Sequence, residues 1–335
     1  MDLKKKITYA LIVLSVLSIL AASLFKGRQK DSVTISRAMM GTIVQVTIME
    51  GPEDNSDRAA ETAFSEIQRL EGILSAYKTD SSDVTRISKN AGASLPVSPD
   101  TIEVLKTAVL VAELSGGAFD PTVGVLGKAW GYSGEKGVVP SREEIGKSLP
   151  LVDYGEIEID EAASKAGLKR KGMSLNLGGV AKGYIVNKAV EALKREGVER
   201  GIIHAGGDMV VFQKDEEVPF SIGIQHPREK RLLGKVRVYN GAVATSGDYE
   251  RFFEINGKKY HHILDPRTGF PAEGTQSATI IAKDPTLADA LSTAVFVMGP
   301  EKGMELIERL PDVEGVIVDS SGRVTKSSGF KGEID

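Results

Sequence analysis

The sequence predicts an α+β fold in which mostly antiparallel sheets pack against helices. Strand-like segments follow one another in runs, above all between residues 201 and 281, and helical segments gather in clusters. The dipeptide Asn256-Gly257 separates two strand-like segments, 252–254 and 260–262, as expected for a tight antiparallel hairpin. A chain of 335 residues, 41% hydrophobic and 26% charged, suffices for one large domain or two medium ones.

The composition excludes several classes of function. The chain has no cysteine, which excludes disulfides, thiolate metal sites, a cysteine nucleophile and a lipid-modified N-terminal cysteine. Its formal net charge of -4 provides no basic field for nucleic acid, so we expect no DNA or RNA partner.

The N-terminus predicts a membrane anchor. Three lysines at 4–6 precede an apolar run over 7–25, whose 19 residues would span roughly 28 Å as a helix. This length favours an uncleaved signal anchor over a signal peptide cleaved near Ala21-Ala22-Ser23, and no polar face supports a buried core helix. We therefore expect a cytoplasmic stub, anchor and linker over 1–31, and a membrane-bound domain over 32–335 on the extracytoplasmic side. The basic residues at 26, 28 and 30 argue against this orientation.

Periodicity predicts the elements of this domain in order. Strands at 33–37 and 42–49 flank the turn at Met40-Gly41, and an amphipathic helix covers 56–76. Ser82 and Ser98 begin helices that run to 89 and 114. The later elements are a helix at 141–147, strands at 157–159 and 167–175, a helix from Gly178-Gly179 to 196, strands through 281, helices at 285–298 and 301–310, and a hairpin of 315–318 with 323–326.

Polar residues on the predicted helix at 285–298 form one candidate site. Asp289 and Thr293 are four residues apart, so they share a helix face, and Ser292 is adjacent. Carboxylate and hydroxyl oxygens suit Mg²⁺. The alternative is a dipole-stabilised aspartate with hydroxyls bonded back to the helix.

The segment 175–184 forms a second candidate, because its glycine turn opens a helix. The N–H groups at such a start favour anions and Lys182 adds charge, but a plain strand-to-helix turn fits equally well. Asp120, at a turn before a predicted helix, either caps that helix or binds a ribose or base edge.

Two histidines follow the predicted hairpin. They alternate along a strand, so only one faces a site, and His262 there is either a general base or a structural residue. Arg267 binds a phosphate or pairs with Asp265. Thr245 and Ser246 meet a phosphate or make a turn.

Seven segments in this order resemble the ApbE family of FAD:protein FMN transferases, over about residues 37–311. They are Met40-Gly41-Thr42, 117–124, 176–183, 205–208, 245–248, 262–266 and 289–293.

The resemblance implies a T-fold-related architecture and a reaction that depends on Mg²⁺. Such an enzyme splits the FAD pyrophosphate, attaches FMN to a threonine or serine of an acceptor flavoprotein and releases AMP. Typical acceptors are subunits of membrane redox complexes, such as Rnf or the sodium-pumping quinone reductase.

The resemblance also implies roles for individual residues. The metal ligands would be Asp289, Ser292, Thr293 and the carbonyl of Gly179, and His262 matches a catalytic histidine. FAD would contact Met40, Tyr77, Ala118, Phe119, Asp120, Asn176, Lys182 and the backbone of Leu264.

This sequence departs from the family at Asn176, where an aspartate is common, and in lacking a lipid-anchoring cysteine. Two other functions share these residues. One is an exported protein that binds FAD without chemistry, and the other is an Mg²⁺-dependent FAD pyrophosphatase that releases FMN and AMP.

Overall fold

The computed structural model of the protein describes residues 32–51, 55–76, 80–132, 137–216 and 218–335. The anchor predicted over 7–25 and the FAD contact predicted at Tyr77 lie outside these residues. Among the helices of the described ranges, none combines the length and the apolar character needed to cross a membrane. The division at residue 31 stays a prediction.

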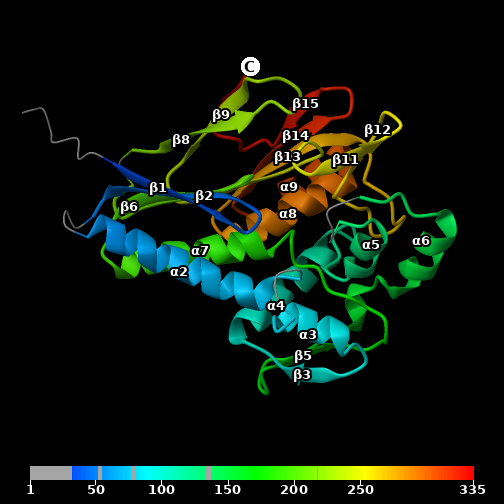
Figure 1. Ribbon diagram of the computed structural model, residues 1–335. Helices are drawn as coiled ribbons and strands as arrows, with labels where there is room; N and C mark the ends of the chain where they lie inside the picture. Colours follow the sequence, from blue (N-terminus) through cyan, green and yellow to red (C-terminus); the bar gives the residue numbers. More distant parts are fainter. Residues whose placement is uncertain (1–31, 52–54, 77–79, 133–136, 217) are drawn as a thin grey trace, which may run out of the picture.

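An eight-stranded antiparallel sheet forms the centre of the molecule (Figure 1). Its strands, in spatial order, are β1 (Val33–Met39), β2 (Thr42–Glu50), β6 (Arg200–Ala205), β7 (Asp208–Gln213), β10 (Gly241–Gly247), β13 (Thr275–Ala282), β14 (Val313–Asp319) and β15 (Val324–Lys326). Because β6 pairs with β2, the sheet joins segments about 150 residues apart in sequence.

Helices cover one face of this sheet. α7 packs on β6 and β7, α8 on β10 and β13, and α9 on β14. The helices of this layer are α2 (Ser56–Leu74), α4 (Pro99–Leu114), α7 (Ala181–Arg195), α8 (Pro285–Met298) and α9 (Pro300–Arg309). Their apolar faces and the inward side chains of the strands form one core, in which Phe64, Leu291 and Phe296 are almost fully buried.

A three-stranded sheet covers part of the opposite face. It consists of β8 (Phe220–Gln225), β9 (Leu232–Val238) and β16 (Gly332–Ile334). Apolar residues alternate along β8, and Phe220 and Ile222 pack on Val211 and Val243 of the large sheet. The large sheet is therefore buried on both faces over its middle strands.

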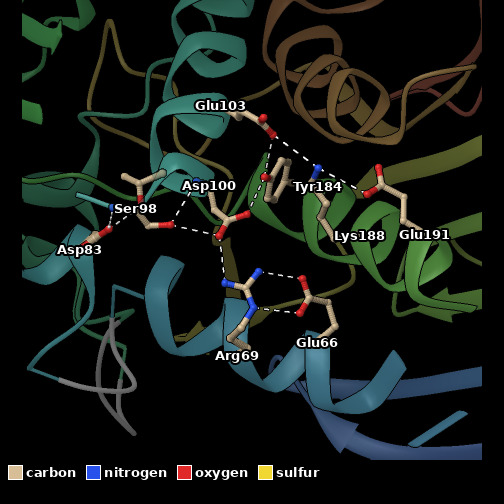
Figure 2. A network of polar contacts seen from close by, with 10 residues as sticks. Glu66, Arg69, Asp83, Ser98, Asp100, Glu103, Tyr184, Lys188 and Glu191 are labelled. Atoms are coloured by element: carbon tan, nitrogen blue, oxygen red, sulfur yellow. Dashed lines mark hydrogen bonds and ion pairs between the residues drawn. The ribbon is translucent and has the colours of Figure 1, made fainter. Parts of the chain in front are cut away.

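A network of charges fixes how α2, α4 and α7 meet (Figure 2). The guanidinium of Arg69 binds both oxygens of Glu66 on its own helix and reaches Asp100 Oδ2 on α4 at 3.0 Å. Asp100 Oδ1 lies 2.8 Å from the hydroxyl of Tyr184 on α7, which also lies 2.7 Å from Glu103. Tyr184 is two residues from Lys182, so this network also sets the position of the first turn of α7.

A smaller part of the chain packs beside the helical layer. It contains α3 (Asp83–Lys89), α5 (Gly124–Ala129), α6 (Arg142–Ser148) and the sheet of β3 (Ser94–Pro96), β5 (Lys165–Leu168) and β4 (Ile157–Asp160). The hairpin of β11 (Phe252–Ile255) and β12 (Lys258–His261) joins this part through an aromatic cluster around Trp130. In that cluster, Phe253 stacks on Tyr260 and Tyr132 stacks on Trp130.

The predicted α+β class is confirmed, and most predicted elements lie within two residues of the observed ones. Asn256 and Gly257 both have positive φ, at 53° and 74°, as the predicted hairpin turn requires. The side chains of Ser82 and Ser98 cap α3 and α4 as expected.

One predicted element was wrong. The strand expected over 167–175 ends at Leu168, because Gly172, at φ 89°, lies in a turn and the segment then follows the loop at 121–124. The helix expected after Asp120 is present as α5, although it begins only at Gly124 and has only six residues.

Candidate active site

The site begins where helices α7 and α8 touch. A Cβ atom on Gly183 would lie 2.1 Å from the carbonyl oxygen of Pro285 and 2.9 Å from Cβ of Asp289. Glycine is therefore required for this approach, and it lets the Gly183 N–H donate to Oδ2 of Asp289 at 2.9 Å. The start of α7 thus holds the buried Asp289 carboxylate in place.

Three charged side chains meet at this contact. The Lys182 ammonium donates to Oδ2 of Asp208, and its Nζ lies 3.8 Å from Oδ1 of Asp289. Burial raises the pKa of Asp289 well above the ordinary value of an aspartate, and the neighbouring Asp208 acts in the same direction. Burial disfavours the ammonium of Lys182, but the two carboxylates outweigh it and raise the pKa of that lysine. The cluster therefore concentrates negative charge that a cation would stabilise.

A group of hydroxyls lies one turn further along α8. The hydroxyl of Ser246, on β10, lies 2.8 Å from that of Ser292 and 3.2 Å from that of Thr293. A Cβ atom on Gly179 would lie 3.0 Å from Oγ1 of Thr293 and 3.2 Å from the ring of Phe119. The four predicted metal ligands are therefore drawn from two neighbouring segments, 179–183 and α8.

The loops that carry other predicted FAD contacts are bonded to each other. The Asn176 N–H donates to the carbonyl of Pro121 at 2.8 Å, and the Asn176 side chain accepts from Gly178 N–H at 2.9 Å. Ala118 and Phe119 are buried in the main core. Segments 118–124 and 174–179 thus form one wall beside the hydroxyls of Ser246, Ser292 and Thr293.

Asp120 stabilises that wall through hydrogen bonds to Thr122 and Tyr154, and it does not cap a helix. Its Oδ1 accepts from the N–H and hydroxyl of Thr122, and its Oδ2 accepts from the N–H of Tyr154. α5 begins later, at Gly124, so the capping interpretation was wrong. Burial raises the pKa of Asp120 despite these bonds.

The two histidines face different environments. His261 is buried, with Nε2 2.9 Å from the Ala272 carbonyl oxygen and its ring edge-on to Phe296. His262 follows the hairpin, and its Nδ1 lies 3.1 Å from the carbonyl oxygen of Arg251. Burial lowers the pKa of His262 to about 4, and the positive charges of Arg251 and Lys182 act in the same direction. His262 is therefore neutral near pH 7 and lies within electrostatic range of Lys182.

The turn at Met40 also reaches this neighbourhood. Met40 has a positive φ of 53°, and its N–H donates to Glu71 at 3.2 Å. The guanidinium of Arg251 donates to the Gly41 carbonyl at 3.4 Å, so the same arginine contacts both this turn and His262.

Two predicted residues lie apart from the charged cluster. Leu264 packs with Trp130 and forms an isolated bridge to Pro271. Arg267 pairs with both oxygens of Asp265 at 2.8 Å, which favours the ion-pair alternative over a phosphate contact.

Reasoning from sequence missed two residues of the cluster. The sequence places Asp208 at the end of a glycine-containing segment and indicates no role for it, and it indicates either a phosphate contact or a turn for Ser246. Ser246 instead lies within strand β10, and its contacts to α8 depend on a pairing between β10 and β13 that no local pattern predicts. The Gly-Gly-Asp order at 206–208 was the available signal for Asp208.

Comparison with known proteins identifies the family. The model of the ApbE family matches residues 40–317. This chain belongs to the ApbE family.

Named relatives and solved structures agree with that membership. An FAD:protein FMN transferase of Treponema pallidum is 32% identical over 311 residues, covering 87% of this chain and 86% of the relative. The crystal structure of an ApbE protein from Thermotoga maritima has a TM-score of 0.83 at 35% identity, covering 89% of this chain and 97% of that one. The flavinyl transferase ApbE from Pseudomonas stutzeri, in its apo form, has a TM-score of 0.76 at 29% identity, covering 89% and 95%.

Proposed function

We propose that this ApbE-family protein is an FAD:protein FMN transferase. The observation that carries the proposal is the meeting of a buried carboxylate, two hydroxyls and a lysine where α7 touches α8. These groups suit a dinucleotide diphosphate and a cation, and the named relatives are FAD:protein FMN transferases.

We propose Mg²⁺ as the cation, held by Asp289, Ser292, Thr293 and the carbonyl of Gly179. The fit rests on the donor set, which is all oxygen, and on the buried carboxylate pair of Asp208 and Asp289. The described part of the chain has no cluster of three or more acidic or histidine side chains that could hold a metal. Mg²⁺ nevertheless needs only one or two carboxylates, because water and substrate phosphates complete its shell. When bound, it would stabilise charge on the phosphate oxygens.

The chain's own residues supply the remaining chemistry. Nδ1 of His262 faces a carbonyl oxygen, so Nδ1 carries the proton and Nε2 keeps its lone pair. Nε2 accepts the proton of the acceptor hydroxyl while the acceptor oxygen bonds to the FMN phosphorus and the bond from that phosphorus to AMP breaks. Lys182, held as a cation, stabilises the charge that gathers on the departing AMP.

Incubation with FAD, Mg²⁺ and an acceptor flavoprotein domain tests the function. Transfer gives an acceptor that keeps flavin fluorescence after denaturation, with one AMP released per flavin. Free FMN and AMP would instead indicate a pyrophosphatase, since water attacks the same phosphorus. Bound FAD that remains intact would indicate a binding protein.

We further propose that the acceptor is a subunit of a membrane redox complex of the Rnf or sodium-pumping quinone reductase type. The apolar run over 7–25 supports an anchor that keeps the enzyme at that membrane, on the extracytoplasmic side. Membrane fractionation of the full chain, with N-terminal sequencing, tests the anchor. Recovery of soluble protein that begins near Ser23 would contradict it.

A further inference from the structure

Asp208 is a buried carboxylate that is not among the proposed cation ligands, and the backbone fixes its position. It is the first residue of β7, where it lies opposite Ala205 of β6 and Ala244 of β10. A Cβ atom on Gly207, just before it, would lie 2.5 Å from the carbonyl oxygen of Thr245. Only 3% of Asp208 is exposed, so its carboxylate cannot turn out to solvent.

The contacts of this carboxylate are uneven. Oδ2 accepts from the Lys182 ammonium, whereas buried Oδ1 has no hydrogen-bond partner among the described residues. Such an unpaired buried oxygen is costly, so a purely structural carboxylate would not be expected here. Within the described residues the hydrogen bond to Asp208 comes from Lys182, which makes Lys182 the residue through which Asp208 can act.

Lys182 lies close to two carboxylates, those of Asp208 and Asp289. Its Nζ contacts Asp208 directly but remains 3.8 Å from Asp289 Oδ1. An ammonium without Asp208 would be drawn fully to Asp289, where it would compete with a divalent cation for the same oxygen. The direct contact with Asp208 leaves Lys182 at the longer distance of 3.8 Å from Asp289 Oδ1.

We propose that Asp208 is a positioning residue that holds Lys182 away from Asp289, so that Asp289 can bind the cation while Lys182 serves the diphosphate. This inference rests on the proposed function, and it assigns to Asp208 an effect exerted only through Lys182.

Four proteins test it: wild type, Asp208→Asn, Lys182→Met and the double variant. Cation affinity is measured as Mn²⁺ binding by electron paramagnetic resonance without FAD, and as the half-saturating Mg²⁺ concentration in FMN transfer. Asp208→Asn should weaken cation affinity by about 10–100-fold, as loss of a group that orients a metal site does. The double variant should recover to within about threefold of wild type, because the competing ammonium is gone.

A merely structural role gives the opposite pattern. Two substitutions in the cluster would then weaken cation binding at least as much as Asp208→Asn alone, and that result overturns the proposal. Asp208→Ser is a second variant at this position. If neither Asp208→Asn nor Asp208→Ser folds, as judged by thermal melting and circular dichroism, the proposal is overturned as well.

A matched surface pair serves as the control. Lys283 and Asp312 form a 3.0 Å ion pair with both side chains mostly exposed. Asp312→Asn and Lys283→Met, alone and together, should leave cation affinity unchanged. Failure of the proposed function would appear separately, as a wild-type protein that binds Mn²⁺ but modifies no acceptor.

Discussion

The ring of His262 has its Nδ1 against the carbonyl oxygen of Arg251, and this contact decides which of its nitrogens can act as a base. With Nδ1 protonated against Arg251, Nε2 is the atom available to the acceptor hydroxyl. The neighbouring His261 has its Nε2 near a carbonyl oxygen and packs on Phe296, so it cannot replace His262.

Replacing His262 with alanine should lower kcat/KM for FMN transfer by about 10²–10⁴-fold, because the general base is lost. FAD affinity, measured by quenching of flavin fluorescence, should change little. Added imidazole should restore part of the rate. An unchanged kcat/KM would remove His262 from the mechanism.

The His262 ring should titrate far below an ordinary histidine. Burial and the nearby cations lower its pKa to about 4 in the free protein, so it stays neutral and able to accept a proton at any pH well above 4. Because the folded pKa lies below the unfolded value near 6.5, the folded protein should lose stability as pH falls through this window. NMR titration of the ring resonances, assigned with the His262→Ala protein, measures the midpoint. A midpoint near 6.5 would contradict the burial argument.

At the residue scale, sequence reasoning succeeded where chemistry and local spacing coincide. Asp289 and Thr293 share one helix face, so their proximity follows from periodicity alone. Asp208 and Ser246 come from two different strands, and their place in the site depends on long-range pairing. Residue spacing carries no information on such pairing.

At the element scale, the close contact of α7 and α8 determines the geometry of the site. Gly183→Ala should destabilise the fold by at least about 1–3 kcal/mol, because the added methyl meets backbone at 2.1 Å and α8 must shift. Cation affinity should fall with it, since Asp289 moves with α8. Denaturant unfolding and Mn²⁺ titration measure the two effects.

Gly72→Ala provides the control for that substitution. Gly72 lies in α2, and nothing lies within 4 Å of an added Cβ. Alanine there should stabilise the helix by roughly 0.5–1 kcal/mol and leave the site unchanged. Equal behaviour of the two variants would show that the α7–α8 approach tolerates a side chain.

The aromatic cluster ties the hairpin that precedes His262 to α5. Trp130 is fully buried, and its indole N–H donates to the Gly269 carbonyl at 2.8 Å. Trp130→Phe should cost about 1–3 kcal/mol, because the carbonyl loses its partner and a void forms. Since Trp130 is the chain's only tryptophan, circular dichroism must follow the unfolding. Phe252→Ala, at a side chain 47% exposed on the same hairpin, should cost much less.

Element boundaries were predictable where a side chain marks them. The side chains of Ser82 and Ser98 cap helices, and Asn256-Gly257 forms a hairpin turn, as their residue types indicate. After Leu168, the apolar residues Met173 and Leu175 stand at alternate positions, as they would in a strand. They are buried instead in a segment that is bonded to the loop at 121–124.

At the scale of the whole molecule, local patterns gave the fold class but not the order of strands. In the central sheet β6 lies beside β2, although the helices α2 to α7 separate the two strands in the sequence. This pairing brings the turn at Met40-Gly41-Thr42 near Gly206. That order allows both faces of the sheet to be buried, by helices on one side and by β8, β9 and β16 on the other.

Cation binding should be visible in the stability of the whole protein, because Asp289 is held between two elements of the core. A ligand that binds only the folded state stabilises it by about 2.7 kcal/mol at 100 times its dissociation constant. Mg²⁺ should therefore raise the melting temperature in a concentration-dependent way, and a chelator should reverse the rise and stop FMN transfer. Asp289→Asn should abolish the effect of Mg²⁺ on melting, since the cation loses its principal charged ligand. An Mg²⁺-dependent rise that persists in Asp289→Asn would place the cation elsewhere, and transfer that continues in excess chelator would exclude a divalent ion from the reaction.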